Sequence, residues 1–239
     1  MGMDGTTGIG TIGIIGAMRE EIDLLRDRLQ DAASETHAGI VYTKGTLHGR
    51  TVAVCKSGVG KVNAAVCAQI LIDRFGVSAV WFTGVAGALD PALDIGDIVV
   101  SESALHHDMD VTALGYPRGV IPYQDTSEFP ADPALVRLAL EAGERLFPGR
   151  CRRGKVLSGD QFVADRDAVR KLREELGGAC TEMEGAAVAQ TCFMNRVPYV
   201  IIRSMSDRAD GAAPDNFAAF TVQAAERSVA LVEEMLRLL

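Results

Sequence analysis

The sequence predicts an α/β sandwich with a largely buried sheet. Strand-like runs rich in Val and Ile alternate with helical runs over most of the 239 residues, and this alternation is typical of a sheet covered by helices. Glycine-rich or polar residues follow most of the strand-like runs directly. Because ligands in α/β folds gather beyond the carboxyl ends of strands, the same observation predicts where a site would lie.

The elements are expected in the following order. Short apolar runs that end at glycine or polar residues predict strands at residues 11–16, 51–57, 79–84, 97–105, 152–159, 179–184 and 199–207. The helical runs between and after them predict helices at residues 17–31, 61–75, 133–147, 165–176, 185–195 and 215–238. No linker, repeat or low-complexity tract interrupts the series, so a single domain is expected at residues 11–239.

Residues 1–10 are small, polar and glycine-rich, and we expect a disordered extension or a non-native remnant there. Gly8, Gly10 and Gly13 satisfy the spacing G-x-G-x-x-G. A dinucleotide site needs a strand before this motif, and none precedes it, so the motif carries little weight.

Composition excludes several classes of protein. A net charge of −8 argues against a nucleic-acid partner, and the longest apolar segments are too short for a membrane span. The five cysteines form no C-x-x-C pair, which is typical of reduced thiols in a reducing compartment. We therefore expect a cytoplasmic protein with no metal, no disulfide and no membrane contact.

Carboxylates beside the predicted strand ends are the candidate chemical groups. On a helical wheel, Ile22, Leu25 and Leu29 fall within about 40° of Met18, and Glu21 lies at the rim of this apolar face. Glu182 and Glu184 stand at the start of a run of small apolar residues, where an unpaired carboxylate would be costly to bury. Solvated rim positions and helix-dipole effects would also explain these glutamates, so other residues must decide.

The segment that follows the strand "YVII" is more informative. Arg203, Ser206 and Asp207 come directly after this apolar run. They would present polar groups to a ligand, or Arg203 and Asp207 could form a local ion pair. The long proline-containing loop at 112–130 suggests a binding flap or a subunit contact.

Two further motifs have other interpretations. "SGVGK" at 57–61 could bind an anion through its amides, but it lacks the spacing of a nucleoside triphosphate loop. "HHDMD" at 106–110 offers metal-type side chains with no second cluster to complete a coordination set, which favours a structural or hydrogen-bonding role.

Seven motifs in order resemble the 5'-methylthioadenosine/S-adenosylhomocysteine nucleosidases, members of the nucleoside phosphorylase superfamily. The motifs are "IGIIGAMREE", "KSGVGKVNAA", "TGVAGALD", "DIVVSESALHHDMDVTALGY", "SGDQF", "TEMEGAAVA" and "VIIRSMSDRAD". The resemblance covers residues 12 to about 238. It implies a single-domain three-layer sandwich, with a central mixed twisted sheet flanked by helices. It also implies hydrolysis of the N-glycosidic bond of adenine nucleosides, without metal or cofactor, in methionine salvage and in removal of methyl-cycle products.

The resemblance also implies roles for single residues. Glu21 would activate the attacking water with Arg203 nearby, Glu184 would bind the ribose hydroxyls and stabilise a cationic sugar, and Asp207 would protonate adenine N7. An oxocarbenium-like sugar needs nearby negative charge and a departing adenine needs a proton, so this division is chemically sensible. The further residues implied for substrate binding are Met18, Val59, Val85, Phe162, Val163, Glu182, Met183, Ser206 and Phe217.

A partner subunit is implied as well. By resemblance, it would complete the pocket for the 5' substituent, which makes a homodimer the expected active unit. The partner's contribution would be Val111, Leu114, Tyr116 and Pro122. Plain core or loop packing would also explain each of these apolar residues taken singly.

This chain departs from the family at two positions. Val85 stands where many members have a serine, and Leu114 stands where an aromatic residue often lines the 5' pocket. The changes keep a futalosine-type substrate open beside 5'-methylthioadenosine, S-adenosylhomocysteine and 5'-deoxyadenosine. A phosphate-dependent phosphorylase and a non-catalytic nucleoside-binding module are two further candidate functions. The glycine turn without arginine argues against the first of these, and the three retained carboxylates argue against the second.

Overall fold

The computed structural model describes residues 10–209 and 213–239. Residues 1–9, which include Gly8 of the glycine motif and most of the expected extension, lie outside the described residues. Within the described part, no helix combines the length and the apolar character that crossing a membrane requires.

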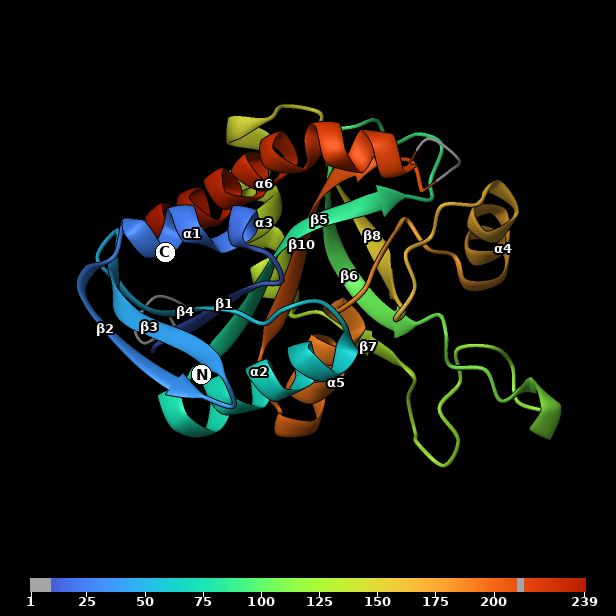
Figure 1. Cartoon of the computed structure of the whole chain (residues 1–239), viewed down its shortest axis with the longest axis horizontal. Coiled ribbons are helices and arrows are strands. Elements are labelled where there is room, and N and C mark those ends of the chain that lie inside the picture. The colour runs from blue at the N-terminus through green and yellow to red at the C-terminus, as the bar shows by residue number, and fades with distance from the viewer. Residues whose placement is uncertain (1–9, 210–212) are drawn as a thin grey trace, which may run out of the picture.

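The core of the molecule is one mixed sheet with helices on both faces (Figure 1). Its strands are β1 (Ile12–Gly16), β2 (Gln30–His37), β3 (Ile40–Leu47), β4 (Arg50–Lys56), β5 (Ala79–Ala88), β6 (Ile98–His106), β7 (Glu128–Pro130), β8 (Cys151–Ser158), β9 (Cys180–Glu182) and β10 (Tyr199–Asp207). Their order is β10-β6-β8-β9-β5-β1-β4-β3-β2, and β7 pairs with β6.

Six helices of the described chain cover the sheet or its edge. They are α1 (Arg19–Asp27), α2 (Lys61–Phe75), α3 (Pro133–Leu146), α4 (Arg166–Leu176), α5 (Gly185–Asn195) and α6 (Ala213–Leu238), and a 3₁₀ turn, η1 (Thr112–Leu114), lies in the loop before β7. Helices α1, α3 and α6 pack together on one face, and α2 and α5 pack together on the other. The expected three-layer sandwich is therefore confirmed.

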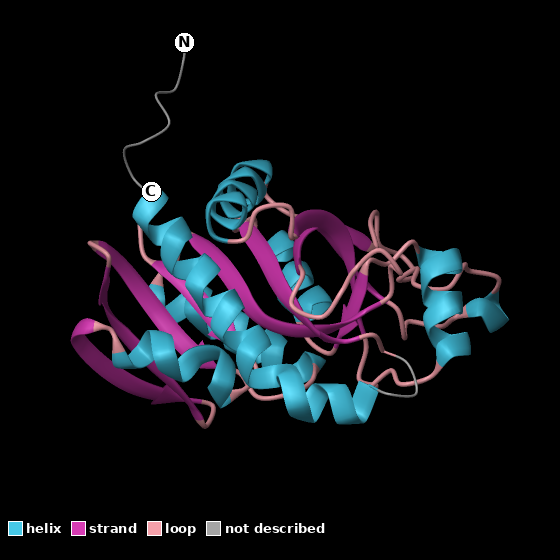
Figure 2. Cartoon of the chain, turned by 90° about the horizontal axis from the view of Figure 1, so that it is seen from above, coloured by secondary structure: helices cyan, strands magenta, loops and turns pink. Residues whose placement is uncertain are grey.

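The sheet closes on itself at one side, because β5 pairs with β10 as well as with β9. The resulting curl is visible in Figure 2. Strands β1, β4, β5 and β10 run parallel, so their carboxyl ends meet at one edge. Strand β9 runs antiparallel to the end of β5, with Thr181 opposite Gly87, and this pairing brings the residues after β9 to the same place.

Local chemistry sets several helix ends. Asp132 accepts hydrogen bonds from the amides of Ala134 and Leu135 at the start of α3, and Asp165 caps α4 in the same way. Such caps satisfy amides that the helix itself leaves without partners. Gly76 ends α2 with φ of 57°, a conformation that glycine adopts without steric cost.

The structure corrects the sequence-based boundaries in the first 50 residues. The helix expected at 17–31 spans only Arg19–Asp27, so Leu29 is not part of its apolar face. The hairpin of β2 and β3 was not predicted. Strand β2, "QDAASETH", is exposed along nearly its whole length and carries few apolar residues, so the usual hydrophobic alternation is absent.

Candidate active site

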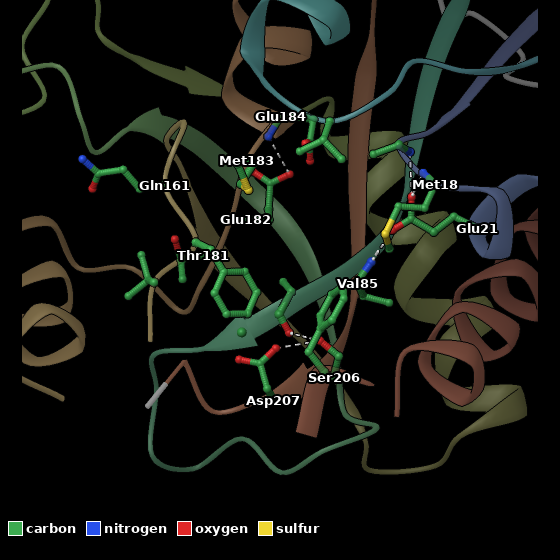
Figure 3. Close-up of a pocket in the computed structure, with 17 residues that line it drawn as sticks. Met18, Glu21, Val85, Gln161, Thr181, Glu182, Met183, Glu184, Ser206 and Asp207 are labelled. Carbon is green, nitrogen blue, oxygen red and sulfur yellow. Dashed lines mark hydrogen bonds between the residues drawn. The ribbon is translucent and has the colours of Figure 1, made fainter. Parts of the chain in front are cut away.

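A cavity of about 340 Å³ lies where the strand ends meet. The residues that line it are Ala17, Met18, Glu21, Val59, Val85, Ala86, Gly87, Gln161, Phe162, Val163, Thr181, Glu182, Met183, Glu184, Ser206, Asp207 and Phe217. All residues predicted for this chain's own side of the site are among them except Arg203. Figure 3 shows Glu184 and Glu21 toward one end of the cavity and Asp207 with Ser206 at the other.

Glu21 is fixed by main-chain donors at the start of α1. Its Oε2 accepts hydrogen bonds from the amides of Ala17 at 2.6 Å and Met18 at 2.8 Å, and its Oε1 accepts one from Val85 at 3.1 Å. Burial raises the pKa of Glu21, while the Arg203 guanidinium and these amides act in the opposite direction. A Cβ at Gly84 would lie 2.6 Å from Glu21 Oε1, so glycine is required there.

Arg203 lies behind the cavity and organises it through Glu182. Its Nη2 donates to Glu182 Oε2 at 2.5 Å, and its guanidinium stacks 3.9 Å from the centre of the Phe82 ring. Glu182 also accepts from the amides of Glu184 and Gly185 and from the hydroxyl of Ser158. The buried Glu182 therefore pairs with Arg203 and also holds the turn that starts α5.

Glu184 faces the cavity and binds one donor from a distant loop. The amide of Gly60 donates to Glu184 Oε1 at 2.7 Å. Burial, and then the neighbouring charge of Glu182, raises the pKa of Glu184 to about 8. The amide that the "SGVGK" loop presents at Gly60 therefore contacts a carboxyl group of the same chain.

Asp207 ends β10 at the opposite side of the cavity. The hydroxyl of Ser206 donates to its Oδ2 at 2.8 Å, and the amide of Ala209 donates to its Oδ1 at 2.7 Å. Only 2% of Asp207 is exposed. A Cβ at Gly87 would lie 2.7 Å from Asp207 Oδ1, so this glycine lets β5 approach the carboxyl group.

Apart from Gln161 and Thr181, the rest of the cavity wall is apolar. The rings of Phe162 and Phe217 meet edge to face, with centroids 5.7 Å apart. Met18, Val85 and Phe217 pack around the small side chains of α6. Phe162 is 50% exposed and Val59 is 51% exposed, so this side of the cavity is open.

The residues predicted to come from a partner subunit do not line this chain's cavity. Val111, Leu114, Tyr116 and Pro122 lie in the segment between β6 and β7. This segment extends away from the body of the molecule (Figure 1). Leu114 is 72% exposed at its tip.

Sequence reasoning missed several contributors. The amides of Ala17 and Val85 are main-chain donors, which no side-chain motif shows. The Gly60 amide lies in the "SGVGK" loop, but its partner Glu184 could not be named from the sequence. Thr181 and Gln161 line the cavity, and Gln161 could have been found because it lies inside the "SGDQF" motif. His106 and His107 do not line the cavity. The described residues contain no group of three or more His, Cys, Asp or Glu arranged to hold a metal ion.

Comparisons with known proteins agree with this geometry. Residues 11–237 match the family model of the phosphorylase superfamily. A 5'-methylthioadenosine/S-adenosylhomocysteine nucleosidase of Tolumonas auensis is 39% identical over 95% of this chain and 98% of its own length. The nucleosidase of the same name from Bacillus anthracis is 42% identical over 94% and 97%.

Solved structures are similar throughout. The nucleosidase of Neisseria meningitidis in complex with methylthio-immucillin-A has a TM-score of 0.92 at 37% identity, covering 96% of this chain and 99% of that one. The nucleosidase of Colwellia psychrerythraea in complex with adenine has a TM-score of 0.91 at 41% identity, covering 96% and 95%. A futalosine hydrolase mutant of Helicobacter pylori has a TM-score of 0.92 at 35% identity, covering 97% and 100%.

Proposed function

The chain belongs to the 5'-methylthioadenosine/S-adenosylhomocysteine nucleosidases of the phosphorylase superfamily, and we propose that three buried carboxyl groups divide the hydrolysis of the N-glycosidic bond between them. The reaction releases adenine and a 5-thioribose. The observation that supports the division is the placement of Glu21 and Glu184 at one end of a single cavity and of Asp207 at the other.

At the sugar end, Glu21 takes a proton from the attacking water. Its carboxyl group is held by three main-chain amides, and burial raises its pKa, toward the range in which a general base works well near neutral pH. Glu184 binds the ribose hydroxyls. Its raised pKa leaves the ligand-free carboxyl group largely protonated near neutral pH, and the positive charge that develops on the sugar favours the ionised form, which in turn stabilises the transition state. The buried positive charge of Arg203 favours the ionised forms of both Glu21 and Glu184.

At the base end, Asp207 protonates N7 of the departing adenine. The Ser206 hydroxyl and the Ala209 amide orient the two oxygens of Asp207, so the acid is fixed before substrate arrives. Phe162 offers an aromatic face to the flat purine, and the Val163 main chain meets its edge.

The 5' substituent lies at the open side of the cavity, among Met18, Val59 and Phe217. A second copy of the chain completes this side with the segment that carries Leu114, in a homodimer. Two observations support this: the half-exposed apolar wall at Val59 and Phe162, and the exposed Leu114 on a segment that points away from its own cavity. Reaction in the cytoplasm, as expected from the cysteines, remains part of this proposal.

Hydrolysis is favoured over phosphorolysis by the charges of the cavity. Its lining, within the described residues, includes no Lys or Arg. The buried Arg203 already forms an ion pair with Glu182. Phosphate would therefore meet buried carboxyl groups without a compensating cation, which is unfavourable.

A second candidate substrate is of the futalosine type. The similarity to the Helicobacter pylori futalosine hydrolase favours it, and Leu114 is smaller than the aromatic residue often found at that position. The chemistry at the glycosidic bond would be the same.

The deciding experiment is adenine release from 5'-methylthioadenosine by the purified protein, without phosphate and with phosphate added. We expect equal release in both buffers and free methylthioribose as the sugar product. Release only with phosphate would show a phosphorylase. Release from a futalosine-type nucleoside alone would replace the substrate and keep the mechanism.

A further inference from the structure

Three charged residues outside the cavity form a closed hydrogen-bonded ring, in which Asp108 joins the loop that ends at Lys61 to the loop that carries Asp160. Asp108 follows β6, Lys61 begins α2, and Asp160 follows β8. Asp108 Oδ1 accepts from Lys61 Nζ at 2.7 Å and Asp108 Oδ2 accepts from the Asp160 amide at 3.0 Å. Asp160 Oδ1 accepts in turn from the Lys61 amide at 2.9 Å. We call this ring of Asp108, Lys61 and Asp160 the loop clasp.

Each joined loop carries a residue that contacts the cavity. Gly60, directly before Lys61, donates the hydrogen bond to Glu184. Phe162 and Val163 follow Asp160 by two and three residues and line the cavity. The loop clasp therefore bridges the group that holds Glu184 and the aromatic wall.

Packing beneath the clasp leaves little space for movement. A Cβ at Gly159 would lie 2.4 Å from the ring of His107, and His107 is only 1% exposed. The loop after β8 therefore rests directly on a buried ring. Asp108, which follows His107, accepts a hydrogen bond from the amide of Asp160, which follows Gly159.

The ion pair in the clasp is partly shielded from solvent. The side chains of Lys61 and Asp108 are 21% and 17% exposed. Burial alone would raise the pKa of Asp108, but the Lys61 ammonium and the Asp160 amide hold it below its ordinary value. Solvent and salt screen such a pair less than a surface pair.

We infer that Asp108 and Lys61 are positioning residues, which fix the spacing between Gly60 and Phe162 and thereby control how tightly the nucleoside is held. The inference rests on the proposed function for its substrate. Adenine stacking on Phe162 and the ribose contacts of Glu184 are both made in the ground state as well as in the transition state, so a loosened clasp acts mainly on KM.

The variant Asp108→Asn is the sharpest test. Asparagine keeps the shape but has a single acceptor oxygen and a donating NH₂ group, whereas two donors, Lys61 Nζ and the Asp160 amide, face this side chain. We expect KM to rise about tenfold with kcat changed less than about threefold. Asp108→Glu, which keeps two acceptors, should recover part of the loss. Asp167→Asn, which removes a carboxylate from an exposed ion pair on α4, is the matched control and should behave as the wild type.

A second measurement does not depend on any substrate. Hydrogen exchange of the ligand-free protein should show faster exchange of the Asp160 and Lys61 amides in Asp108→Asn than in Asp167→Asn. Because this result is read without turnover, it separates failure of the inference from failure of the proposed function. Unchanged exchange together with unchanged KM would overturn the inference. A lower melting temperature with unchanged KM would also overturn it, since the clasp would then serve stability alone.

Discussion

The two sides of the cavity are built in different ways. At the sugar end, Glu21 and Glu184 are 3% and 6% exposed, and main-chain amides of this chain donate hydrogen bonds to both. At the open side, Phe162 is 50% exposed. Leu114, which is predicted to complete the pocket of a partner subunit, is 72% exposed and does not line the cavity of its own chain. In the function we propose, the chemistry is therefore complete within one chain, whereas recognition of the 5' substituent needs a second copy.

Physical chemistry explains the difference. A buried carboxylate is tolerated only when fixed donors surround it, and these must come from the fold itself. An apolar wall needs only to be shielded from water, because apolar burial has no preferred direction. The surface of a second protein chain can shield it as well as the chain's own core can. We therefore expect changes at the buried ends to remove turnover, and changes at the open side to alter substrate preference.

The largest effect is expected for Asp207→Asn. Without a proton to donate, adenine must leave as an anion, so kcat should fall by about 10³-fold or more. The Ala209 amide can still bond to the amide oxygen of asparagine, so the fold and the affinity for adenine should persist. Single-turnover kinetics and calorimetric adenine titration check the two parts. Undiminished turnover would remove Asp207 from the role of acid.

Glu21→Gln should have the next largest effect. The water loses its base, and the glutamine NH₂ group meets amides that already point toward this side chain. We expect kcat to fall by about 10²-fold to 10³-fold with a smaller change in KM. A parallel urea titration shows whether the variant is folded. A properly folded variant with the wild-type kcat would assign the water to another group.

A smaller effect concerns stability against pH. The pKa of Glu184 is about 8 in the folded protein and about 4.3 in an unfolded chain. The folded state therefore holds more protons between these values, so its stability is fully present below the lower pKa and is lost as pH rises through the higher one. The loss from this group is at most about 1.4 kcal/mol per pH unit.

Glu184→Gln removes this titration. The free energy of unfolding in urea, measured on ligand-free protein between pH 5 and pH 8, should fall less steeply in the variant than in the wild type. The raised pKa of Glu21 acts in the same direction and remains in both proteins. Equal slopes would mean that Glu184 is ionised throughout and that the sugar end is less shielded than its burial indicates.

How far the sequence could predict the two sides also differs. Glu21 was placed at the rim of an apolar helix face, and it points inward even though that helix ends at Asp27. One turn of helix is enough to fix this direction. Arg203 and Asp207 were located because polar residues followed a buried strand.

The sequence could not show contacts made across the fold by main-chain atoms. Gly60 and Glu184 are 124 positions apart, and the donor is an amide that every residue except proline carries. The partner of Arg203 is Glu182, on another strand, and no spacing along the chain indicates that pair. The seven motifs include the segments that line the cavity, and the folded structure shows the hydrogen bonds and the ion pair that connect these segments.

The smallest effect is expected at the open side, in Leu114→Ala. If a partner subunit brings Leu114 to the 5' substituent, truncation should raise KM for 5'-methylthioadenosine by about threefold to tenfold, as loss of a few buried methyl groups implies. Adenine affinity and kcat should remain unchanged, because the sugar and base ends do not involve this residue. Val41→Ala, which shortens an equally apolar residue, 49% exposed, on strand β3, is the matched control.

Dilution sharpens the same test. A pocket shared between two copies loses its 5' wall when the dimer dissociates, so KM of the wild type should rise at low protein concentration. The value should approach that of Leu114→Ala, whose own KM should depend less on dilution. If Leu114→Ala weakens adenine binding as much as it raises KM, the side chain acts on the fold of its own chain, and the open side is not completed by a partner.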